Sequence, residues 1–390
     1  MRRPALVSRL TPFTSTIFAE MTALATRTGA VNLGQGFPDT DGPAGMLEEA
    51  QRAIASGVNQ YPPGPGRPEL RAAIAAQRAG YGIEFDPDTE VLVTVGATEA
   101  IASALLALTE PGDEVILFEP YYDSYAASVA LAGATRKVVS LVDGERFSVD
   151  LDAVRAAITP KTRAILVNSP HNPTGTVFTH EELAGIAALC VEHDLIAITD
   201  EVYESLTYDL GCGGVPHLPL CTFPGMAERT VTISSAGKMF NCTGWKIGWV
   251  CAPEELTSAV RAAKQFLTFV GGAPFQPAVA YALEHESAWV TALRDDLAAK
   301  RTRLSEGLAA AGFGVRPSAG TYFVCADVRP LGFSDGAELC LRLPERVGVA
   351  AVPVQVFTDT PDAWKHIVRF AFCKKDEVLD EAIVRLHKLA

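Results

Sequence analysis

Residues 234–249 read SSAGKMFNCTGWKIGW, and they place one lysine between a glycine and an apolar pair. Hydroxyl side chains precede Lys238 and a second lysine, Lys246, follows it, yet the run carries too little charge for a solvated surface. A surface lysine needs no such neighbours, and a side chain that only snorkels to water fits poorly beside Met239 and Phe240. We therefore treat Lys238 as a candidate functional residue.

Apolar, β-branched runs flank this stretch and recur upstream of it. From Glu90 onward they alternate with longer helix-like segments, the pattern of parallel strands joined by crossover helices. They are apolar throughout rather than alternating, as expected for strands covered by helices on both faces, so we predict a large α/β domain. The runs are EVLVTVGA (90–97), DEVILFEP (113–120), TRAILVNSP (162–170), LIAITDEVY (195–203), RTVTISS (229–235) and WKIGWVCAP (245–253).

The last third of the chain has a different pattern. After about Glu254 long helical segments dominate, and the strand-like runs GTYFVCADV (320–328) and HIVRFAFC (366–373) are separated by helices. A chain of 390 residues also exceeds the size at which one hydrophobic core stops growing. We predict a large domain over residues 46–290 and a smaller α+β domain made of residues 1–45 and 291–390.

The charge balance excludes several classes of partner. With 33 basic and 46 acidic residues the net charge is −13, which repels phosphodiester backbones and anionic membranes at long range. The N-terminal MRRPALVSRLTPF is interrupted before an apolar core of signal-peptide length can form, and no segment approaches about 20 uninterrupted apolar residues. We expect a cytoplasmic protein that binds neither nucleic acid nor membrane.

The eight cysteines are scattered singly, without a CxxC pair or the density of a disulfide scaffold. We expect them to be reduced and mostly buried. Cys212, His217 and Cys221 are a possible metal-ligand group, but the group lacks a fourth ligand and lies in a loop rich in glycine and proline. The sequence therefore favours the absence of a metal site.

The informative residues should lie where the strands end, since ligands of open α/β sheets bind beyond the carboxyl ends of the strands. Each such segment is weak evidence alone: residues 96–98 could simply start a helix, Asp200 could be a helix cap or metal ligand, and Asn172 could lie in an ordinary turn. Together they suit a ligand with a phosphate, an aromatic ring, a ring nitrogen and an aldehyde. Pyridoxal 5′-phosphate is such a ligand, and its chemistry requires a lysine and a carboxylate at the ring nitrogen.

Motifs along nearly the whole chain strengthen this interpretation. Through a series of motifs that run in order from residue 31 to residue 372, the chain resembles the class I, fold-type I pyridoxal-phosphate aminotransferases of the kynurenine and glutamine transaminase branch. The resemblance implies a seven-stranded, mostly parallel sheet between helices. The motifs are VNLGQGFPD (31–39), NQYPPGPGRPELRAAIA (59–75), GATEAI (96–101), EPYYDSY (119–125), HNPTG (171–175), TDEVY (199–203), SSAGKMFNCTGWKIGW and VRFAF (368–372).

A finer resemblance rests on NLGQGFPD, GVNQYPPGPG (57–66), NCTGWKIGW (241–249) and FVGGAPFQPAVA (269–280). This wording is similar to actinobacterial proteins named N-succinyldiaminopimelate aminotransferases. It implies N-succinyl-LL-2,6-diaminopimelate as the amino donor.

The resemblance assigns chemical roles to four residues. Lys238 is implied to hold the cofactor as a Schiff base and to move a proton at the substrate α-carbon, which requires a pKa lowered by burial and nearby positive charge. Asp200 is implied to keep the ring nitrogen protonated. Tyr203 and Asn172 are implied to donate hydrogen bonds to the phenolate oxygen of the cofactor.

Further residues are implied to hold the cofactor. Tyr122 would stack on its ring, with Tyr121 as the alternative if the alignment slips by one. Tyr61 would reach the phosphate of a neighbouring subunit, since in this family two active sites form across a dimer interface, and we therefore expect a homodimer. The phosphate itself would be bound by Ala97, Thr98, Ser235 and Lys246.

Substrate binding is implied for a second group. A guanidinium binds both oxygens of a carboxylate in one plane, and Arg369 matches the family position for the α-carboxylate. Gly36 could add a backbone N–H, and Asn172 lies close by in the family pattern. Phe18 and Tyr61 would line the side-chain pocket.

We therefore expect an aminotransferase that moves an α-amino group between an L-amino acid and a 2-oxo acid in two stages, by a ping-pong mechanism. N-succinyl-LL-2,6-diaminopimelate with 2-oxoglutarate is the favoured pair. Kynurenine, glutamine, methionine and aromatic amino acids stay open as donors, as does β-lyase activity on cysteine S-conjugates. A ligand-sensing regulator is disfavoured by the acidic charge and by the lack of a basic helix-turn-helix before the fold, and a noncatalytic cofactor binder by the presence of every chemical group.

Overall fold

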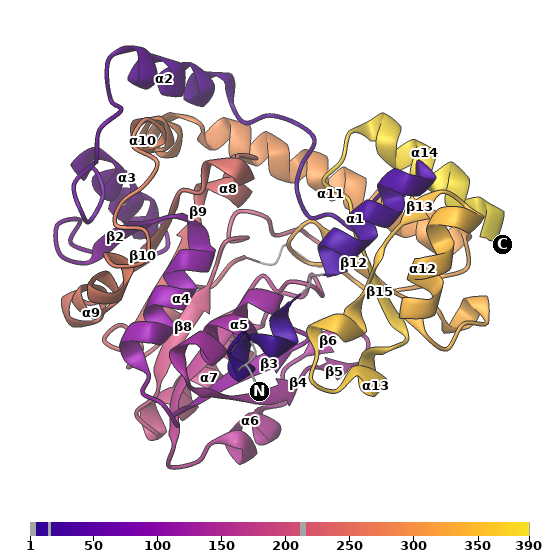
Figure 1. The fold of residues 1–390 in the computed structure, drawn as a ribbon, viewed down its shortest axis with the longest axis horizontal. Helices are drawn as coiled ribbons and strands as arrows, with labels where there is room; N and C mark the ends of the chain where they lie inside the picture. The colour runs from indigo at the N-terminus through magenta and orange to yellow at the C-terminus, as the bar shows by residue number, and fades with distance from the viewer. Residues whose placement is uncertain (1–4, 15–16, 211–215, 390) are drawn as a thin grey trace.

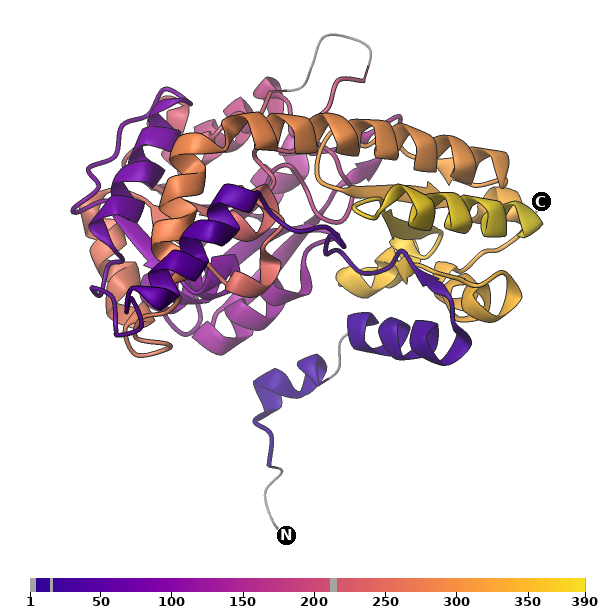
Figure 2. The same ribbon diagram turned by 90° about the horizontal axis from the view of Figure 1, so that it is seen from above.

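We describe the protein from a computed structural model that defines residues 5–14, 17–210 and 216–389. Figure 1 shows two bodies, one built on a seven-stranded sheet and a smaller one built on a four-stranded sheet. Helix α11 (Ser287–Ala310) extends from the larger body along the smaller one (Figure 2). The domain limits expected after residues 45 and 290 stay a prediction.

The strands of the large sheet lie in the order β2-β10-β9-β8-β7-β3-β4. All pairs are parallel except those of β10, which runs antiparallel to both of its neighbours. The predicted fold class, a mostly parallel seven-stranded sheet, is confirmed. The strands are β2 (Val91–Thr94), β3 (Glu114–Glu119), β4 (Thr135–Ser140), β7 (Thr162–Asn168), β8 (Ile196–Asp200), β9 (Thr230–Ser235) and β10 (Gly248–Cys251).

The strands are continuously apolar because both faces of the sheet are covered. In β3, Val115 and Leu117 pack in a core shared with α4 (Gly96–Leu108) and α5 (Asp123–Ala132). The alternate residues Ile116 and Phe118 pack in a second core with α7 (His180–Glu192). Successive side chains of a strand point to opposite faces, so burial of both faces requires an uninterrupted apolar run.

Two features of this sheet were not predicted. Strand β4 lies at the edge, and its sequence TRKVVS is mostly exposed or half-buried, so it lacks the apolar run by which the other strands were recognised. The reversed direction of β10 also has no signature in its composition. It depends on the short connection from β9, which brings the chain back alongside.

The remaining helices cover the outside of both bodies. Around the large sheet lie α2 (Ala44–Ala55), α3 (Pro68–Ala79), α6 (Leu151–Ala157), α8 (Ala236–Met239), α9 (Glu254–Lys264) and α10 (Phe275–His285). The smaller body contains α1 (Ile17–Thr28), α12 (Gly336–Arg346), α13 (Pro361–Trp364) and α14 (Asp376–Leu386). Within the described parts of the chain, none of the helices combines the length and apolar character required to cross a bilayer.

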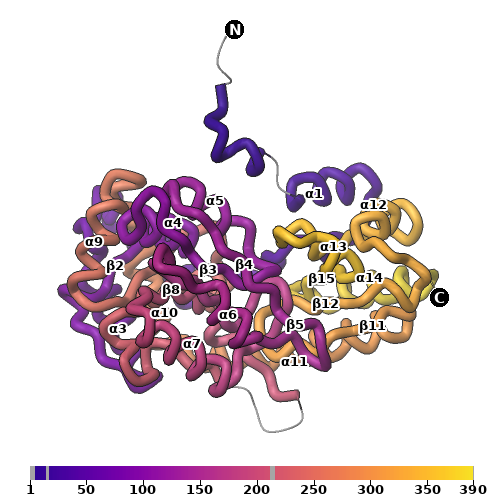
Figure 3. The backbone as a smooth tube through the Cα atoms, turned by 90° about the horizontal axis from the view of Figure 1, so that it is seen from below, coloured from indigo at the N-terminus to yellow at the C-terminus, as the bar shows by residue number. Residues whose placement is uncertain are grey.

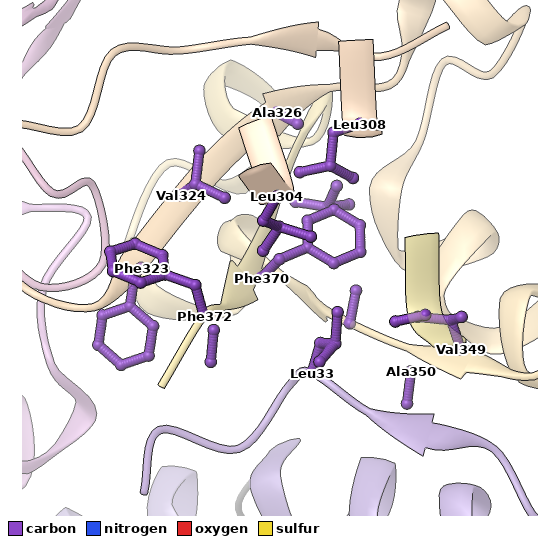
Figure 4. Close-up of a cluster of buried hydrophobic side chains, with 14 of the residues drawn as sticks. Leu33, Leu304, Leu308, Phe323, Val324, Ala326, Val349, Ala350, Phe370 and Phe372 are labelled. Carbon is purple, nitrogen blue, oxygen red and sulfur yellow. The ribbon is translucent and has the colours of Figure 1, made fainter. Parts of the chain in front are cut away.

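The smaller body has its own core, in which Leu304 and Leu308 of α11 pack with Phe370 (Figure 4). Its sheet is antiparallel, in the order β11 (Gly314–Val315), β12 (Phe323–Asp327), β15 (Ile367–Ala371) and β14 (Val352–Pro353). The N-terminal segment joins this body through β1 (Val31–Asn32), which pairs in parallel with β13 (Val349–Ala350). Before it, the short helix η1 (Ser8–Phe13) lies at the surface of the larger body, beside α5, and its Phe13 packs against the core there (Figure 3).

A buried ion cluster anchors the chain just after β8. Nη1 of Arg78, on α3, lies 2.7 Å from Glu204 Oε2 and 3.1 Å from Glu201 Oε2, and all three side chains are shielded from solvent. Ser234 Oγ donates to Glu204 Oε1 over 2.8 Å, which ties the end of β9 to the same cluster. The cluster therefore fixes the segment that follows Asp200.

His217 belongs to this cluster rather than to a group of cysteines, since its Nε2 lies 2.9 Å from Glu201 Oε2. Cys221 is buried, and burial raises the pKa of its thiol to about 12. Cys212 lies outside the described residues. Glu201, Glu204 and His217 have ligand atoms close enough to share a cation, and the guanidinium of Arg78 already supplies a positive charge there.

We predict that Arg78→Ala lowers the free energy of unfolding by about 3–5 kcal/mol, because it leaves two buried carboxylates without their cation. The midpoint of urea unfolding measures this loss. Arg155→Ala is the control, since Arg155 and its partner Glu192 are 55% and 51% exposed and such a pair contributes at most about 1 kcal/mol. Equal losses in the two variants would contradict the prediction.

Candidate active site

One cavity of about 340 Å³ brings together every predicted site residue except Tyr61. It lies at the carboxyl edge of the large sheet, where the smaller body meets it. The predicted residues that line it are Phe18, Gly36, Ala97, Thr98, Tyr122, Asn172, Asp200, Tyr203, Ser235, Lys238, Lys246 and Arg369.

Strand direction explains why these residues meet. Strands β8 and β9 end at Asp200 and Ser235, and α8, which carries Lys238, begins directly after β9. Because β10 is antiparallel, the residue shortly before its start, Lys246, lies at the same edge as the ends of the parallel strands. Asp200, Ser235, Lys238 and Lys246 thus reach one edge of the sheet.

The start of α4 forms an anion cradle at this edge. The first amides of a helix have no partner within it and carry the positive end of its dipole. Gly96 has φ +73°, and a Cβ atom added there would lie 2.9 Å from Lys246 Nζ. A Cβ atom on Gly248 would lie 2.6 Å from the carbonyl carbon of Gly96. Only glycine therefore leaves room for the helix start and the ammonium to face one site.

Asp200 is a buried carboxylate in the floor of the cavity. Tyr125 Oη donates to its Oδ2 over 2.6 Å, and Asn168 Nδ2 donates to its backbone oxygen over 2.8 Å. Burial raises the pKa of Asp200 to about 6, although the hydrogen bond from Tyr125 and the charge of Lys238 act to lower it. At pH 7 the group is therefore mostly ionised and suited to hold a positively charged partner.

Lys238 projects into the cavity from α8. Its Nζ donates to Tyr322 Oη over 2.6 Å and lies 3.5 Å from the backbone oxygen of Gly36. The pKa of Lys238 is lowered to about 8, mainly by burial and also by the charges of Arg369 and Lys246, while Cys373 and Asp200 act in the opposite direction. A substantial fraction of the amine is consequently neutral near physiological pH.

Arg369 enters the cavity from β15 of the smaller body and is 1% exposed. Its guanidinium lies over the ring of Phe323, 3.9 Å from the centroid, with the rings of Phe18 and Phe357 at 5.3 and 5.4 Å. These contacts hold the guanidinium plane in one orientation. Its Nε has no hydrogen-bond partner among the described residues, although it is buried. A planar acceptor such as a carboxylate would complete the set.

The other predicted residues take up supporting positions. Asn172 receives a hydrogen bond from Arg369 Nη1 at its Oδ1, over 2.9 Å, and its backbone N–H donates to Asn168 Oδ1 over 2.8 Å. The buried ring of Tyr203 lies edge-on to that of Tyr322, with centroids 5.2 Å apart. The hydroxyl of Tyr122 is hydrogen-bonded to Thr98, at the start of α4.

The two tyrosines considered for ring stacking are clearly separated. Tyr122 lines the cavity, whereas Tyr121 turns away from it and donates from Oη to Asp359 Oδ1 over 2.6 Å. Tyr61 does not reach the cavity of its own chain. It is 80% exposed and packs edge-on against Phe269, with ring centroids 5.3 Å apart.

A short segment, residues 34–37, covers the cavity, and we call it the strap. Its backbone oxygens accept hydrogen bonds from three side chains: Gly34 from Arg369 Nη2 over 3.0 Å, Gly36 from Tyr322 Oη over 2.5 Å, and Phe37 from Lys374 Nζ over 2.8 Å. A Cβ atom on Gly36 would lie 2.5 Å from the Phe323 ring. Glycine at position 36 therefore allows the Phe323 ring to keep its contact with the guanidinium of Arg369.

Sequence reasoning missed several contributors to this site. Asn168 and Tyr125, which position Asp200, lie within the quoted strand and EPYYDSY motifs but were not singled out. Tyr322 and Phe323 lie in a run recognised only as a strand. Their aromatic side chains carry no local signal of function, because the contacts that define them are made with residues distant in sequence.

Comparisons with known proteins agree with this geometry. Residues 28–386 match the family model described as aminotransferase class I and II. The chain is 63% identical over 394 residues to a Mycobacterium tuberculosis protein named probable N-succinyldiaminopimelate aminotransferase, with 98% of each chain covered. The solved structure of that N-succinyldiaminopimelate aminotransferase covers 99% of this chain and is itself fully covered, with 64% identity and a TM-score of 0.96.

Other relatives are more distant. The methionine aminotransferase of Escherichia coli is 38% identical with 98% of each chain covered, and its structure, YbdL, has a TM-score of 0.93 over 99% of this chain and all of that one. Human kynurenine–oxoglutarate transaminase 3 is 37% identical over 96% of this chain and 88% of its own length.

The lowered pKa of Lys238 predicts unusual reactivity without any cofactor. Only the neutral amine is acylated, so labelling of Lys238 by acetic anhydride should rise with pH through a midpoint near pH 8, rather than near the ordinary lysine value of 10.5. Peptide mass spectrometry of the cofactor-free protein measures this midpoint, with the exposed Lys161 as an internal reference. A midpoint for Lys238 near pH 10 would contradict the site described above.

Proposed function

The chain belongs to the class I and II aminotransferases, and on this premise we propose that it transfers the α-amino group of N-succinyl-LL-2,6-diaminopimelate to 2-oxoglutarate. Membership of this family makes it a pyridoxal 5′-phosphate-dependent transaminase of small amino and 2-oxo acids. The observation that carries the choice of donor is the much higher identity to the Mycobacterium tuberculosis relative than to the methionine and kynurenine transaminases.

The cavity fits the cofactor of this family. Its phosphate requires an anion site, which the start of α4 and Lys246 offer in a space that a single Cβ atom would fill. Its ring nitrogen requires an anionic partner, and Asp200 is the buried carboxylate of the cavity. We propose that Ala97, Thr98, Ser235 and Lys246 hold the phosphate.

We propose that the ring of the cofactor lies against Tyr122, with Asp200 at its nitrogen and Tyr203 and Asn172 at its phenolate oxygen. When bound, the cofactor supplies a protonated ring that withdraws electrons from the substrate α-carbon. Asp200 holds the proton on the ring nitrogen, because its carboxylate is fixed by Tyr125 and shielded from water. A hydrogen bond from Arg369 Nη1 to Asn172 Oδ1 also links this region to Arg369.

Lys238 is proposed to bind the cofactor covalently through Nζ and to act as the base at the substrate α-carbon. Its pKa near 8 suits both tasks, since a base works best when its pKa is close to the working pH. Below pH 8 the protonated form dominates, so activity should fall as the pH is lowered through that value. The neighbouring charges of Arg369 and Lys246 help to keep the amine neutral.

Arg369 is proposed to bind the α-carboxylate common to all donors and acceptors. Its aromatic surroundings exclude water, which strengthens a charge-assisted pair, and its unpartnered Nε provides one arm of a two-pronged contact. Gly36 and Phe18, which line the same side of the cavity, are proposed to complete this end of the substrate site.

We propose that the enzyme acts as a homodimer in which Tyr61 reaches the phosphate site of the partner. Tyr61 packs against Phe269, which is 53% exposed, and Phe266 and Leu267, just before Phe269 in the chain, are 85% and 49% exposed. An exposed cluster of large apolar side chains is typical of a protein interface. In such a dimer Tyr61 would act in the cavity of the partner, because it does not reach the cavity of its own chain.

The identity of the donor is tested with a panel of amino acids added to the cofactor-loaded protein, by following the absorbance change of the bound cofactor. N-succinyl-LL-2,6-diaminopimelate should act at a concentration at least about tenfold lower than glutamine, methionine or kynurenine. Lys238→Ala should abolish the response. The reverse order of donors would replace the proposal with a general glutamine- or kynurenine-type transaminase, and pyruvate release from a cysteine S-conjugate without any 2-oxo acid would indicate a β-lyase.

Arg369→Lys tests the carboxylate site. An ammonium keeps the charge but cannot make the planar two-pronged contact, so kcat/KM for the donor should fall about 100-fold, or about 2.7 kcal/mol, while cofactor affinity is retained. Steady-state kinetics and cofactor titration measure the two quantities. Arg316→Lys, which changes a guanidinium paired with Asp143 outside the cavity lining, is the control. Unchanged donor kinetics in Arg369→Lys would remove Arg369 from the proposed site.

A further inference from the structure

The hydroxyl of Tyr322 lies between Lys238 and Gly36, two residues that line the cavity, although the proposed function gives it no role. It accepts a hydrogen bond from Lys238 Nζ over 2.6 Å and donates one to the Gly36 oxygen over 2.5 Å. We propose that Tyr322 is a further catalytic residue, which holds the Nζ of Lys238 in place and stabilises its protonated form during proton transfer. This inference rests on the proposed role of Lys238 as the base.

The direction of the two hydrogen bonds gives Tyr322 this role. Its own proton points to the backbone oxygen of Gly36, so the lone pairs of its oxygen face Nζ and can only accept. Burial raises the pKa of Tyr322 well above its ordinary value, so the hydroxyl keeps its own proton and no phenolate forms that could take one from the lysine. The proton removed from the substrate α-carbon therefore stays on Nζ, as an ammonium that donates to Tyr322 Oη.

The ring of Tyr322 is held firmly enough to position another group. It is 1% exposed, and its edges meet the rings of Tyr203 and Phe323 at centroid distances of 5.2 and 4.8 Å. With the ring fixed, the hydroxyl has one location. The amine at the end of four flexible methylenes is thereby given a defined position.

The backbone before Tyr322 supports the same conclusion. Thr321 has φ +66°, a conformation that β-branched residues rarely adopt, and three contacts hold it there. Its N–H donates to the Leu206 oxygen, its oxygen accepts from Tyr208 Oη, and its Oγ1 accepts from the N–H of Phe323. A costly backbone conformation that is held in this way indicates that the direction of the following aromatic residues matters.

The hydrogen bond from Lys238 to Tyr322 shifts the pKa of the lysine in the direction opposite to burial. Burial and two nearby cations drive the pKa of Lys238 down, which favours the neutral base but weakens the amine as a proton carrier. A hydrogen-bond acceptor that faces the ammonium favours the charged form and so raises the pKa of Lys238 back toward its ordinary value. Tyr322 would thus set the balance between accepting the proton and keeping it.

The test compares Tyr322→Phe with a matched control, Tyr121→Phe. Both remove the hydroxyl of a buried tyrosine, but Tyr121 Oη donates to Asp359 Oδ1, away from Lys238 and from the cavity lining. In the cofactor-free protein, the pH midpoint for acetylation of Lys238 should fall by about one pH unit in Tyr322→Phe and stay at the wild-type value in Tyr121→Phe. An unchanged or higher midpoint in Tyr322→Phe would overturn the proposal.

Kinetics of the loaded enzyme supply a second readout. Tyr322→Phe should lower kcat by about 10- to 100-fold with little change in the donor KM, because the substrate contacts stay and only the proton carrier is affected. A rise in KM at unchanged kcat would instead make Tyr322 a structural support of the strap and would overturn the proposal. Should the phenylalanine variant fail to fold, Tyr322→Met also removes the hydroxyl and carries the same expectations.

The two proposals fail in different ways. If no amino donor changes the absorbance of the loaded wild-type protein, the proposed function is wrong. The labelling midpoints are measured without cofactor or substrate, so they still decide whether Tyr322 controls the protonation of Lys238.

Discussion

Parallel pairing of β7 with β8 is the constraint on which the site depends. The register places Asn168 beside Asp200, so that the amide of Asn168 can donate to the backbone oxygen of Asp200 and its carbonyl can receive the N–H of Asn172. One side chain thereby fixes the end of one strand and the start of the loop after the other. A slip of one residue would move every side chain of a strand to the opposite face and would take Asn168 away from Asp200. The stability of the sheet and the geometry of the site are consequently inseparable.

Charge in the cavity is organised against the charge of the whole molecule. The chain carries a net charge of −13, whereas Lys238, Lys246 and Arg369 surround a single carboxylate, that of Asp200, in the lining of the cavity. Desolvation lowers the pKa of Lys238 and raises that of Asp200. The pKa values of Asp200 and Lys238 thus both lie closer to 7 than the ordinary values of these side chains. This convergence allows proton transfer near pH 7 and favours dianionic or carboxylate ligands despite the acidic surface.

The sequence was most informative where burial imposes a simple pattern. Continuous apolar runs predicted the central strands, and polar residues just after those runs predicted the lining of the cavity. The edge strand β4 escaped prediction because most of its residues are exposed or half-buried and its composition is mixed. Tyr322 escaped for a different reason: its function arises from Lys238 and Gly36, which are distant in sequence. Local patterns report burial and turns, but not which distant atom a hydroxyl will meet.

The strap shows how the two bodies are made to act together. Its three backbone oxygens are bound by side chains from the smaller body, and one of them, that of Gly36, also lies near Lys238 on the larger body. Backbone acceptors cannot be lost by substitution, so this connection depends mainly on the donors and on the small size of Gly36. Any movement of the smaller body would displace Arg369 and Tyr322 together. In the proposed mechanism, the smaller body therefore positions both the guanidinium that would bind the substrate carboxylate and the hydroxyl that contacts Lys238, so a substrate held by Arg369 would be aligned with Lys238 by the same contacts.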